Sequence, residues 1–110
     1  MNTRLSYLYR DACNYKKFNY IVISGILEEK QIEFLLKDKL FFIPSEVGLP
    51  DLQDDVFSVD DHIWHELEKI ELTNEPPTIG IDANLLLERF IAASRKNWNE
   101  YEVMSKKGII

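Results

Sequence analysis

Two short stretches near the start of the chain are apolar runs bounded by polar residues. Residues 5–9 (LSYLY) and 18–24 (FNYIVIS) are rich in aromatic and β-branched side chains, which suit the pleated, half-buried surface of a sheet. The connection from Arg10 to Lys17 is polar and short enough for a hairpin, and Gly25 breaks the second run. The pattern therefore predicts two strands joined by a turn.

Two longer segments repeat their apolar residues at the spacing of a helix. The first runs from Glu28 to Leu40, with acidic residues at its positive N-terminal end and lysines at its negative C-terminal end. The second begins at Asp82, a good N-cap residue, and runs to about Trp98. The two predicted apolar stripes are Ile32, Leu35, Leu36 and Leu40, and Ala83, Leu86, Leu87, Phe90 and Ile91.

The segment between these helices mixes several patterns. Residues 41–43 suit either a strand or buried chain, and residues 44–59 predict a long irregular loop. Residues 64–72 fit both a helix and a strand, and we favour a strand. The last ten residues have no clear pattern. Together the elements predict an α+β fold, a small antiparallel sheet packed against two helices, as one compact domain over residues 1–98 followed by a C-terminal tail over residues 99–110.

Composition narrows the class of protein. The chain has 110 residues, of which 45% are hydrophobic, and this suits one globular domain. Its net charge of −6 argues against non-specific binding of nucleic acid by the chain as a whole. No run approaches the roughly 18 apolar residues of a membrane span, and the N-terminus lacks the features of a signal peptide. Because the lone Cys13 cannot form an internal disulfide, we expect a reducing, cytoplasmic location.

Charge is distributed unevenly along the chain. Residues 1–20 hold four basic groups against one acid, and residues 51–71 hold eight acids against one lysine. Residues 89–107 hold five basic groups against two acids. The acidic middle either complements the basic ends within the fold or presents an acidic face to a basic partner.

The stretch DDHIWHEL, residues 60–67, concentrates the residue types of a metal or acid–base site. It contains both histidines of the chain, His62 and His65, beside the carboxylates Asp60, Asp61 and Glu66. The chain has no third histidine and no second cysteine, so every further metal ligand would be a carboxylate. The other interpretation is a structural corner whose imidazoles hydrogen-bond a neighbouring turn. The sequence favours the structural corner, and we expect neither a bound metal nor a cofactor.

The predicted hairpin turn carries a second candidate site. Its residues are Tyr9, Arg10, Asp11, Asn14, Tyr15 and Lys16. Cations beside tyrosine rings suit a small phosphorylated ligand, whereas in the structural interpretation Asp11 and Asn14 shape the turn and Arg10 pairs with an acid of residues 51–71. The opposite charges of the two segments predict that this turn and the His62/His65 corner meet in the fold.

The motifs YRDACNYK (residues 9–16), GLPDL (48–52) and DDHIWHEL (60–67) carry a resemblance. In combination they resemble the YRDxxNYK, GLPDL and DDHxWHEL signatures of a family of small bacterial proteins of unassigned function, over most of residues 7–98. The resemblance implies an accessory or mobile-element protein of the prophage type, by analogy, and it supplies no activity, substrate or cofactor. Cys13 stands where the family is expected to have a small polar residue, which argues against a nucleophilic role for this thiol.

Together these patterns favour a small acidic, non-enzymatic binding protein. An inhibitor or immunity type would use residues 51–61 and 66–71 against a basic protein surface, whereas a ligand-sequestering type would use Arg10 and its neighbours for an anionic ligand. The alternative is a metal-assisted hydrolase that uses His62, His65 and a neighbouring carboxylate. A homodimer is a further expectation, because the tryptophans and the aromatic strands offer more apolar surface than one small core needs.

Overall fold

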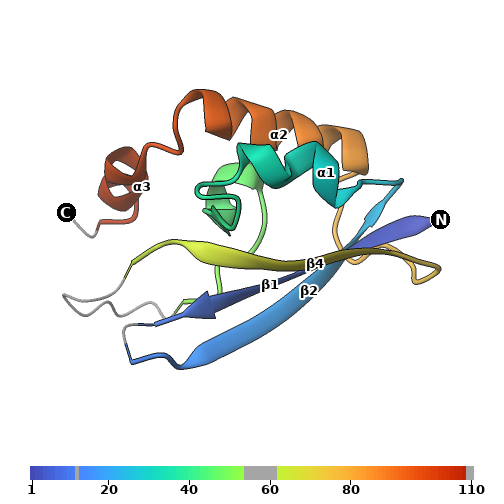
Figure 1. Cartoon of the computed structure of the whole chain (residues 1–110), viewed down its shortest axis with the longest axis horizontal. Coiled ribbons are helices and arrows are strands. Elements are labelled where there is room, and N and C mark those ends of the chain that lie inside the picture. The colour runs from blue at the N-terminus through green and yellow to red at the C-terminus, as the bar shows by residue number, and fades with distance from the viewer. Residues whose placement is uncertain (12, 54–61, 109–110) are drawn as a thin grey trace.

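The sheet of this protein is antiparallel and small. The computed structural model describes residues 1–11, 13–53 and 62–108. Within them lie four strands, β1 (Asn2–Arg10), β2 (Lys16–Ser24), β3 (Phe41–Phe42) and β4 (His65–Thr73), in the order β2-β1-β4-β3 (Figure 1). The predicted α+β class, with a small antiparallel sheet and helices, is confirmed.

The central strand is β1, which pairs with a neighbour on both of its edges. It pairs with β2 along its whole length, from Asn2 opposite Ser24 to Arg10 opposite Lys16. On its other edge it pairs with β4, whose last residue, Thr73, also lies opposite Asn2. Both predicted N-terminal strands are therefore confirmed and extend further than expected. The strand favoured over residues 64–72 is confirmed as β4, which spans residues 65–73.

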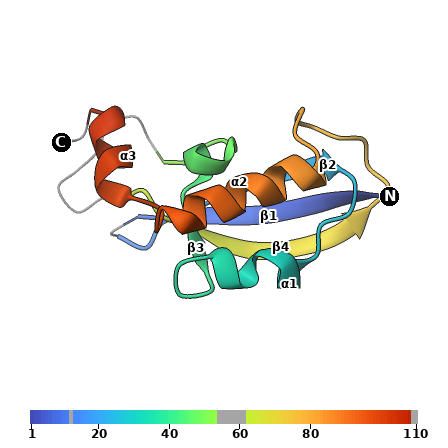
Figure 2. The ribbon, with the colours of Figure 1, turned by 90° about the horizontal axis from the view of Figure 1, so that it is seen from above.

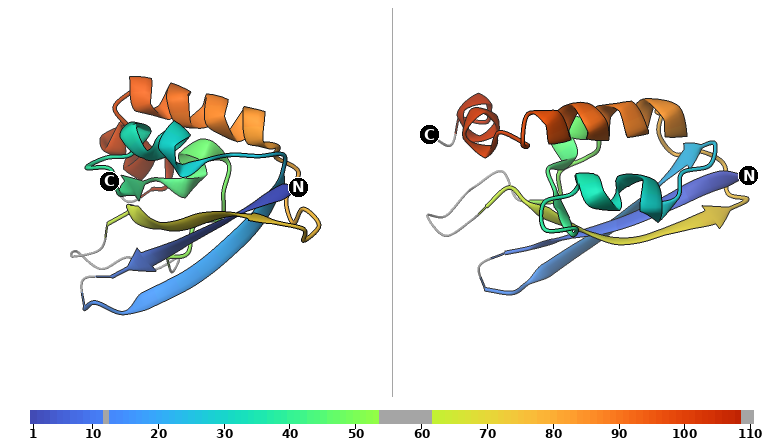
Figure 3. Two further views of the ribbon diagram at one scale, coloured as in Figure 1. Left: turned by 45° about the vertical axis from the view of Figure 1, so that its right-hand side comes forward. Right: turned by 45° about the horizontal axis from the view of Figure 1, so that its top comes forward.

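The helices lie on one side of the sheet and leave the other side uncovered (Figures 1 and 3). The longest, α2 (Ala83–Arg95), lies along the sheet with the short α1 (Glu29–Ile32) beside it (Figure 2). Two 3-10 helices, η1 (Glu33–Leu35) and η2 (Pro44–Val47), and helix α3 (Glu100–Lys106) complete this layer. None of the helices in the described ranges is long and apolar enough to cross a membrane.

The core fills the space between the helices and the covered face of the sheet. Its fully buried side chains include Leu5 and Tyr7 from β1, Ile23 from β2, and Leu86 and Phe90 from α2. Period-two alternation in the strands and the helical stripe of α2 direct these residues inward. The apolar pattern that predicted the strands and the second helix is therefore the pattern that builds the core.

The predicted helix from Glu28 to Leu40 is wrong in its second half. It begins as expected, with a capping box between Glu28 and Gln31, but the α-helix ends at Ile32 and the 3-10 turn that follows ends at Leu35. Leu36 is extended, at ψ 151°, and the chain then turns through left-handed residues so that it can enter β3. The apolar stripe predicted too long a helix, because Leu36 is buried from an extended segment and not from the face of a helix.

The second predicted helix begins correctly and ends early. The Asp82 carboxylate caps it by accepting a hydrogen bond from the Leu85 N–H at 2.8 Å. Helix α2 ends at Arg95, short of Trp98, and a left-handed joint leads into α3. Residues 99–110 were expected to be a tail, yet residues 100–106 of that span are helical and bury Val103 in the core.

Candidate functional site

The hairpin turn and the histidine corner meet, as the charges of the two segments predict. The Arg10 Nε donates to the Glu66 carboxylate at 2.9 Å, across the β1–β4 pair. Arg10 also donates to the Asn14 side-chain oxygen at 2.6 Å. The Glu66 carboxylate keeps the pKa of the guanidinium above its usual value. Asp60 and Asp61 lie outside the described residues.

The turn itself is organised by its own polar side chains. The Asp11 carboxylate accepts from the N–H groups of Cys13 and Tyr15, both at 2.9 Å. Asn14 takes the left-handed conformation, with φ 67°, which asparagine tolerates better than most residues. Tyr15 and Lys16 point to solvent. Asp11 and Asn14 therefore shape the turn, as the structural interpretation holds.

Both histidines are held by backbone groups. The His62 Nε2 donates to the Arg10 carbonyl at 2.8 Å, and its Nδ1 accepts from the Trp64 N–H at 3.1 Å. The His65 Nδ1 donates to the Ile63 carbonyl at 3.1 Å, and its Nε2 accepts from the Leu52 N–H at 2.9 Å. A metal bound through these nitrogens would have to break such a bond. Within the described ranges, no three His, Cys, Asp or Glu side chains gather as metal ligands do.

His65 is fully buried. Tyr9 packs against its ring, with centroids 5.0 Å apart, and the Tyr9 hydroxyl donates to the His62 carbonyl. Burial lowers the pKa of His65 to about 4. A neutral imidazole with one donating and one accepting nitrogen satisfies this environment. The corner therefore acts as a structural lock between β1, β4 and the loop at Leu52.

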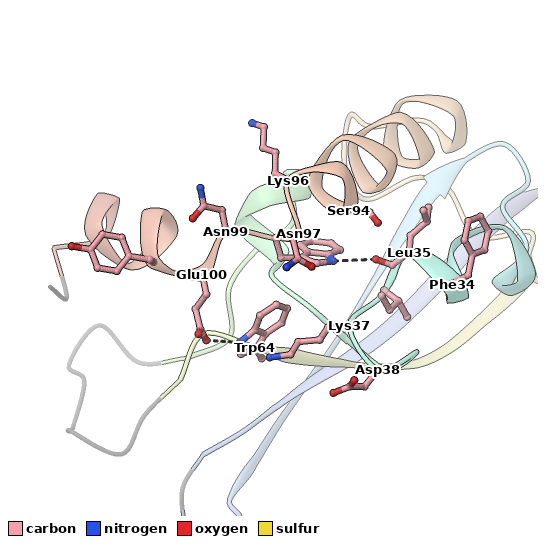
Figure 4. Close-up of a pocket in the computed structure, with 13 residues that line it drawn as sticks. Phe34, Leu35, Lys37, Asp38, Trp64, Ser94, Lys96, Asn97, Asn99 and Glu100 are labelled. Atoms are coloured by element: carbon pink, nitrogen blue, oxygen red, sulfur yellow. Dashed lines mark hydrogen bonds between the residues drawn. The ribbon is translucent and has the colours of Figure 1, made fainter.

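A different site, which the sequence did not indicate, is a cleft between the η1 turn and the joint of α2 and α3. It has a volume of about 710 Å³, within the size range of ligand pockets. Its walls come from the two segments that follow η1 and α2, with Trp64 between them (Figure 4). The lining residues are Phe34, Leu35, Leu36, Lys37, Asp38, Trp64, Ser94, Lys96, Asn97, Trp98, Asn99, Glu100 and Tyr101.

This cleft collects most of the left-handed, non-glycine residues in the part of the chain that the structure describes. Of the six left-handed residues other than glycine in the described ranges, four line it: Asp38, Asn97, Trp98 and Asn99. A left-handed tryptophan is a conformational outlier that costs about 1–2 kcal/mol. The joint is held because Trp98 is buried and its indole N–H donates to the Leu35 carbonyl at 3.0 Å. Strain of this kind concentrates at functional sites.

The electrostatics of the cleft centre on Trp64. The Lys37 ammonium lies over its ring, 4.6 Å from the centroid, and its indole N–H donates to the Glu100 carboxylate (Figure 4). Trp98 meets the same ring edge-on, with centroids 6.3 Å apart. Trp64 is thus fixed in place with a cation on its ring and an anion at its edge. The only sequence signal for this site is Trp98 between two asparagines, which suits a left-handed joint.

The chain was also compared with known proteins. No protein-family model, curated protein or solved structure matches it. The resemblance to a family of small bacterial proteins stays a prediction, and the argument for function rests on the cleft and the corner.

Proposed function

We propose that this protein is a small binding protein whose Trp64 cleft receives a basic side chain, lysine or arginine, from a protein partner. The observation that carries the proposal is the cation already present over Trp64. Lys37 occupies the place that a basic ligand would take on an aromatic ring, with the Glu100 carboxylate beside it. Cation–π attraction of this kind contributes about 0.5–1 kcal/mol at an exposed site and more where water is excluded.

The charges around the cleft support a cationic guest. The carboxylates of Asp38 and Glu100 belong to its lining, and the chain as a whole carries a net charge of −6. An acidic protein attracts a basic partner over several ångströms before contact. Lys96 also belongs to the lining, but its side chain extends away from Trp64 (Figure 4). A basic protein surface was one of the two partners that the sequence favours.

The other expected partner, a small phosphorylated ligand at the hairpin turn, has weaker support. The guanidinium of Arg10 already pairs with Glu66 and with Asn14. An anion bound there would have to compete with a carboxylate across the same two strands. The hydrolase alternative has weaker support as well, because both histidines lie outside the cleft and are bonded to backbone groups. An accessory, immunity-type role in the cytoplasm stays a prediction.

A matched pair of peptides tests the proposal. The probes are Gly-Gly-Arg-Gly-Gly and the same peptide with citrulline, which keeps the shape of arginine and removes its charge. NMR titration of the tryptophan indole signals measures binding. We expect the arginine peptide to shift the Trp64 signal in a saturable way and the citrulline peptide to leave it unchanged. Equal binding of both peptides, or of neither, contradicts the proposal.

Variants locate the binding site. Trp64→Leu should abolish binding, because it removes the ring that faces the cation. Lys37→Met should tighten binding about two- to fivefold, since a competing cation worth about 0.5–1 kcal/mol leaves the ring. The control is Lys30→Met, which removes the same charge from a lysine that pairs with Glu28 outside the cleft. If both lysine variants tighten binding equally, net charge and not the Trp64 ring controls the affinity.

A further inference from the structure

Strand β2 lies at an edge of the sheet, and the second half of its outer edge is covered by residues near Thr78 and Asp82. The Thr78 N–H donates to the Val22 carbonyl, and the Val22 N–H donates to the Thr78 hydroxyl, both at 2.9 Å. Ser24 forms a short parallel bridge with Asp82. Among the residues that the structure describes, no other backbone group bonds to this edge. Within residues 1–11, 13–53 and 62–108, the outer edge of the first half of β2 has no such backbone partner.

The direction of the open backbone groups follows from Val22. Because its N–H and carbonyl both point away from β1, the same groups of Tyr20, Phe18 and Lys16 do so too, as alternate residues of an antiparallel strand must. The side chains of Phe18 and Tyr20 are 63% and 50% exposed. Because Ile21 and Ile23 point into the core, Phe18 and Tyr20 project from the opposite face of the strand. On that face the Arg4 guanidinium lies 5.2 Å from the Tyr20 ring centre. The edge therefore combines unpaired backbone with exposed aromatic surface.

We propose that this edge pairs with the same edge of a second copy of the chain, in an antiparallel arrangement with Phe18 on the two-fold axis. Such pairing joins the two sheets into one continuous sheet. It requires a stretch of strand whose outward backbone groups are accessible in both copies. The open stretch runs from Lys16 to Tyr20, bounded by the hairpin turn at one end and by Thr78 at the other.

The fit of the two copies can be followed residue by residue. With Phe18 opposite Phe18, Lys16 lies opposite Tyr20 of the second copy, and the reverse pair follows by symmetry. These three pairs present about six backbone hydrogen bonds. The next residues of each copy leave the strand in the hairpin turn, so they do not collide with Thr78. The second copy brings a strand that stops at the same two boundaries, the hairpin turn and Thr78, and for this reason we favour it as the occupant.

The charges of the edge also suit self-pairing. Lys16 of one copy lies four residues along the strand from Lys16 of the other, about 14 Å, which exceeds the screening length of about 8 Å in physiological salt. Each Lys16 instead lies opposite a Tyr20, whose ring already has the Arg4 guanidinium 5.2 Å from its centre, so the aliphatic stem of the lysine packs beside the ring while its ammonium stays in water. At the centre, Phe18 meets Phe18, a cross-strand aromatic contact that stabilises antiparallel pairing.

Two variants of Phe18 test the dimer by sedimentation or light scattering across a range of micromolar concentrations. We expect the wild type to dimerise reversibly. Phe18→Pro should be a monomer that keeps its fold, because its missing N–H points away from β1 and proline is tolerated on edge strands. Phe18→Lys is the second variant, since an edge lysine opposes pairing without altering the backbone. The control is Phe34→Lys, which changes an exposed phenylalanine away from β2 and should stay a dimer.

A disulfide test reports the register directly. In the Cys13→Ser background, Phe18→Cys should oxidise to a covalent dimer, because facing residues of a hydrogen-bonded pair lie about 5.5 Å apart at Cα. Phe34→Cys in the same background should not. A wild type that stays monomeric at every concentration overturns the proposal. So does a dimer that survives both Phe18→Pro and Phe18→Lys. Since Trp64→Leu should still dimerise, the result is independent of the cleft.

Discussion

Replacing His65 with glutamine is expected to remove the part of the acid sensitivity of this fold that His65 contributes between pH 6.5 and 4. His65 is fully buried and neutral, and its Nε2 accepts the Leu52 N–H at 2.9 Å. Protonation would place a charge in the core, and the new N–H at Nε2 would point at the Leu52 N–H, so that two donors would face each other. Glutamine offers an acceptor oxygen near the same place and does not titrate. The substitution therefore separates the ionisation of the ring from its hydrogen bond.

The magnitude follows from the difference in pKa between the folded and unfolded chains. Burial lowers the pKa of His65 from 6.5 to about 4 in the folded state. The neutral form favours folding, so its contribution is complete above pH 6.5 and is lost as the pH falls toward 4. At about 1.36 kcal/mol per unit of pKa, the loss of unfolding free energy is about 3 kcal/mol. Below pH 4 the ring is protonated in both states and the loss stops growing.

The assay is urea unfolding followed by tryptophan fluorescence at pH 7.5, 6, 5 and 4. The carboxylates titrate in the wild type and the variant alike, so the difference between the two curves isolates His65. A control variant, Phe42→Leu, destabilises the same region, because the Phe42 ring lies 6.4 Å from that of His65, yet it adds and removes no ionisable group. It should run parallel to the wild type. A His65→Gln curve that is just as steep as the wild type would refute the reasoning.

Three further substitutions test the local structure by the same urea assay. Asp82→Ala should cost about 1 kcal/mol of unfolding free energy, because the Leu85 N–H loses its cap at the start of α2; Asp82→Asn is the control that keeps an acceptor, and an equal loss in both would contradict the cap. Gly48→Ala should cost more than 1 kcal/mol, since φ is +82° and the new Cβ would lie 2.0 Å from an Arg89 nitrogen; an unchanged midpoint would show that the turn relaxes. Thr3→Val should cost about 1–3 kcal/mol, because the buried Thr3 hydroxyl donates to the Gly25 carbonyl at 2.7 Å and accepts the Leu27 N–H at 3.0 Å; Thr3→Ser, which keeps the hydroxyl, should cost less.

The sequence predicted those elements whose apolar pattern is accompanied by a local signal for where the element begins or ends, such as a turn or a cap. Strands β1 and β2 are joined by a short turn, and Asp82 caps α2, so each is specified by neighbouring residues. The helix predicted to reach Leu40 failed because its last turn is needed to enter β3, a pairing with residues more than twenty positions away. Helix α3 was missed because it is short and buries a single residue, Val103.

The meeting of the hairpin turn with the histidine corner could be predicted from the sequence, whereas the Trp64 cleft could not. Opposite charges in the hairpin turn and in the histidine corner were enough to predict their meeting, since Arg10 and Glu66 pair across adjacent strands. The cleft could not be predicted in this way. It depends on the left-handed joint at Trp98 and on the contact between Lys37 and Trp64. These segments lie far apart in the sequence, and neither their charges nor their apolar spacing indicates that they meet.

The central position of β1 has a consequence for synthesis on the ribosome. The β1–β2 hairpin can form once residue 24 has emerged, but the strand that covers the other edge of β1 ends only at Thr73. At about 5–20 residues per second, translation takes roughly 2–10 seconds to supply that strand. During this interval the nascent hairpin exposes both of its strand edges, since Thr78 and Asp82 have not been made, and the apolar face formed by Leu5 and Tyr7. The vulnerable moment for this protein is therefore cotranslational, when Leu5 and Tyr7 are most open to chaperones and to neighbouring nascent chains.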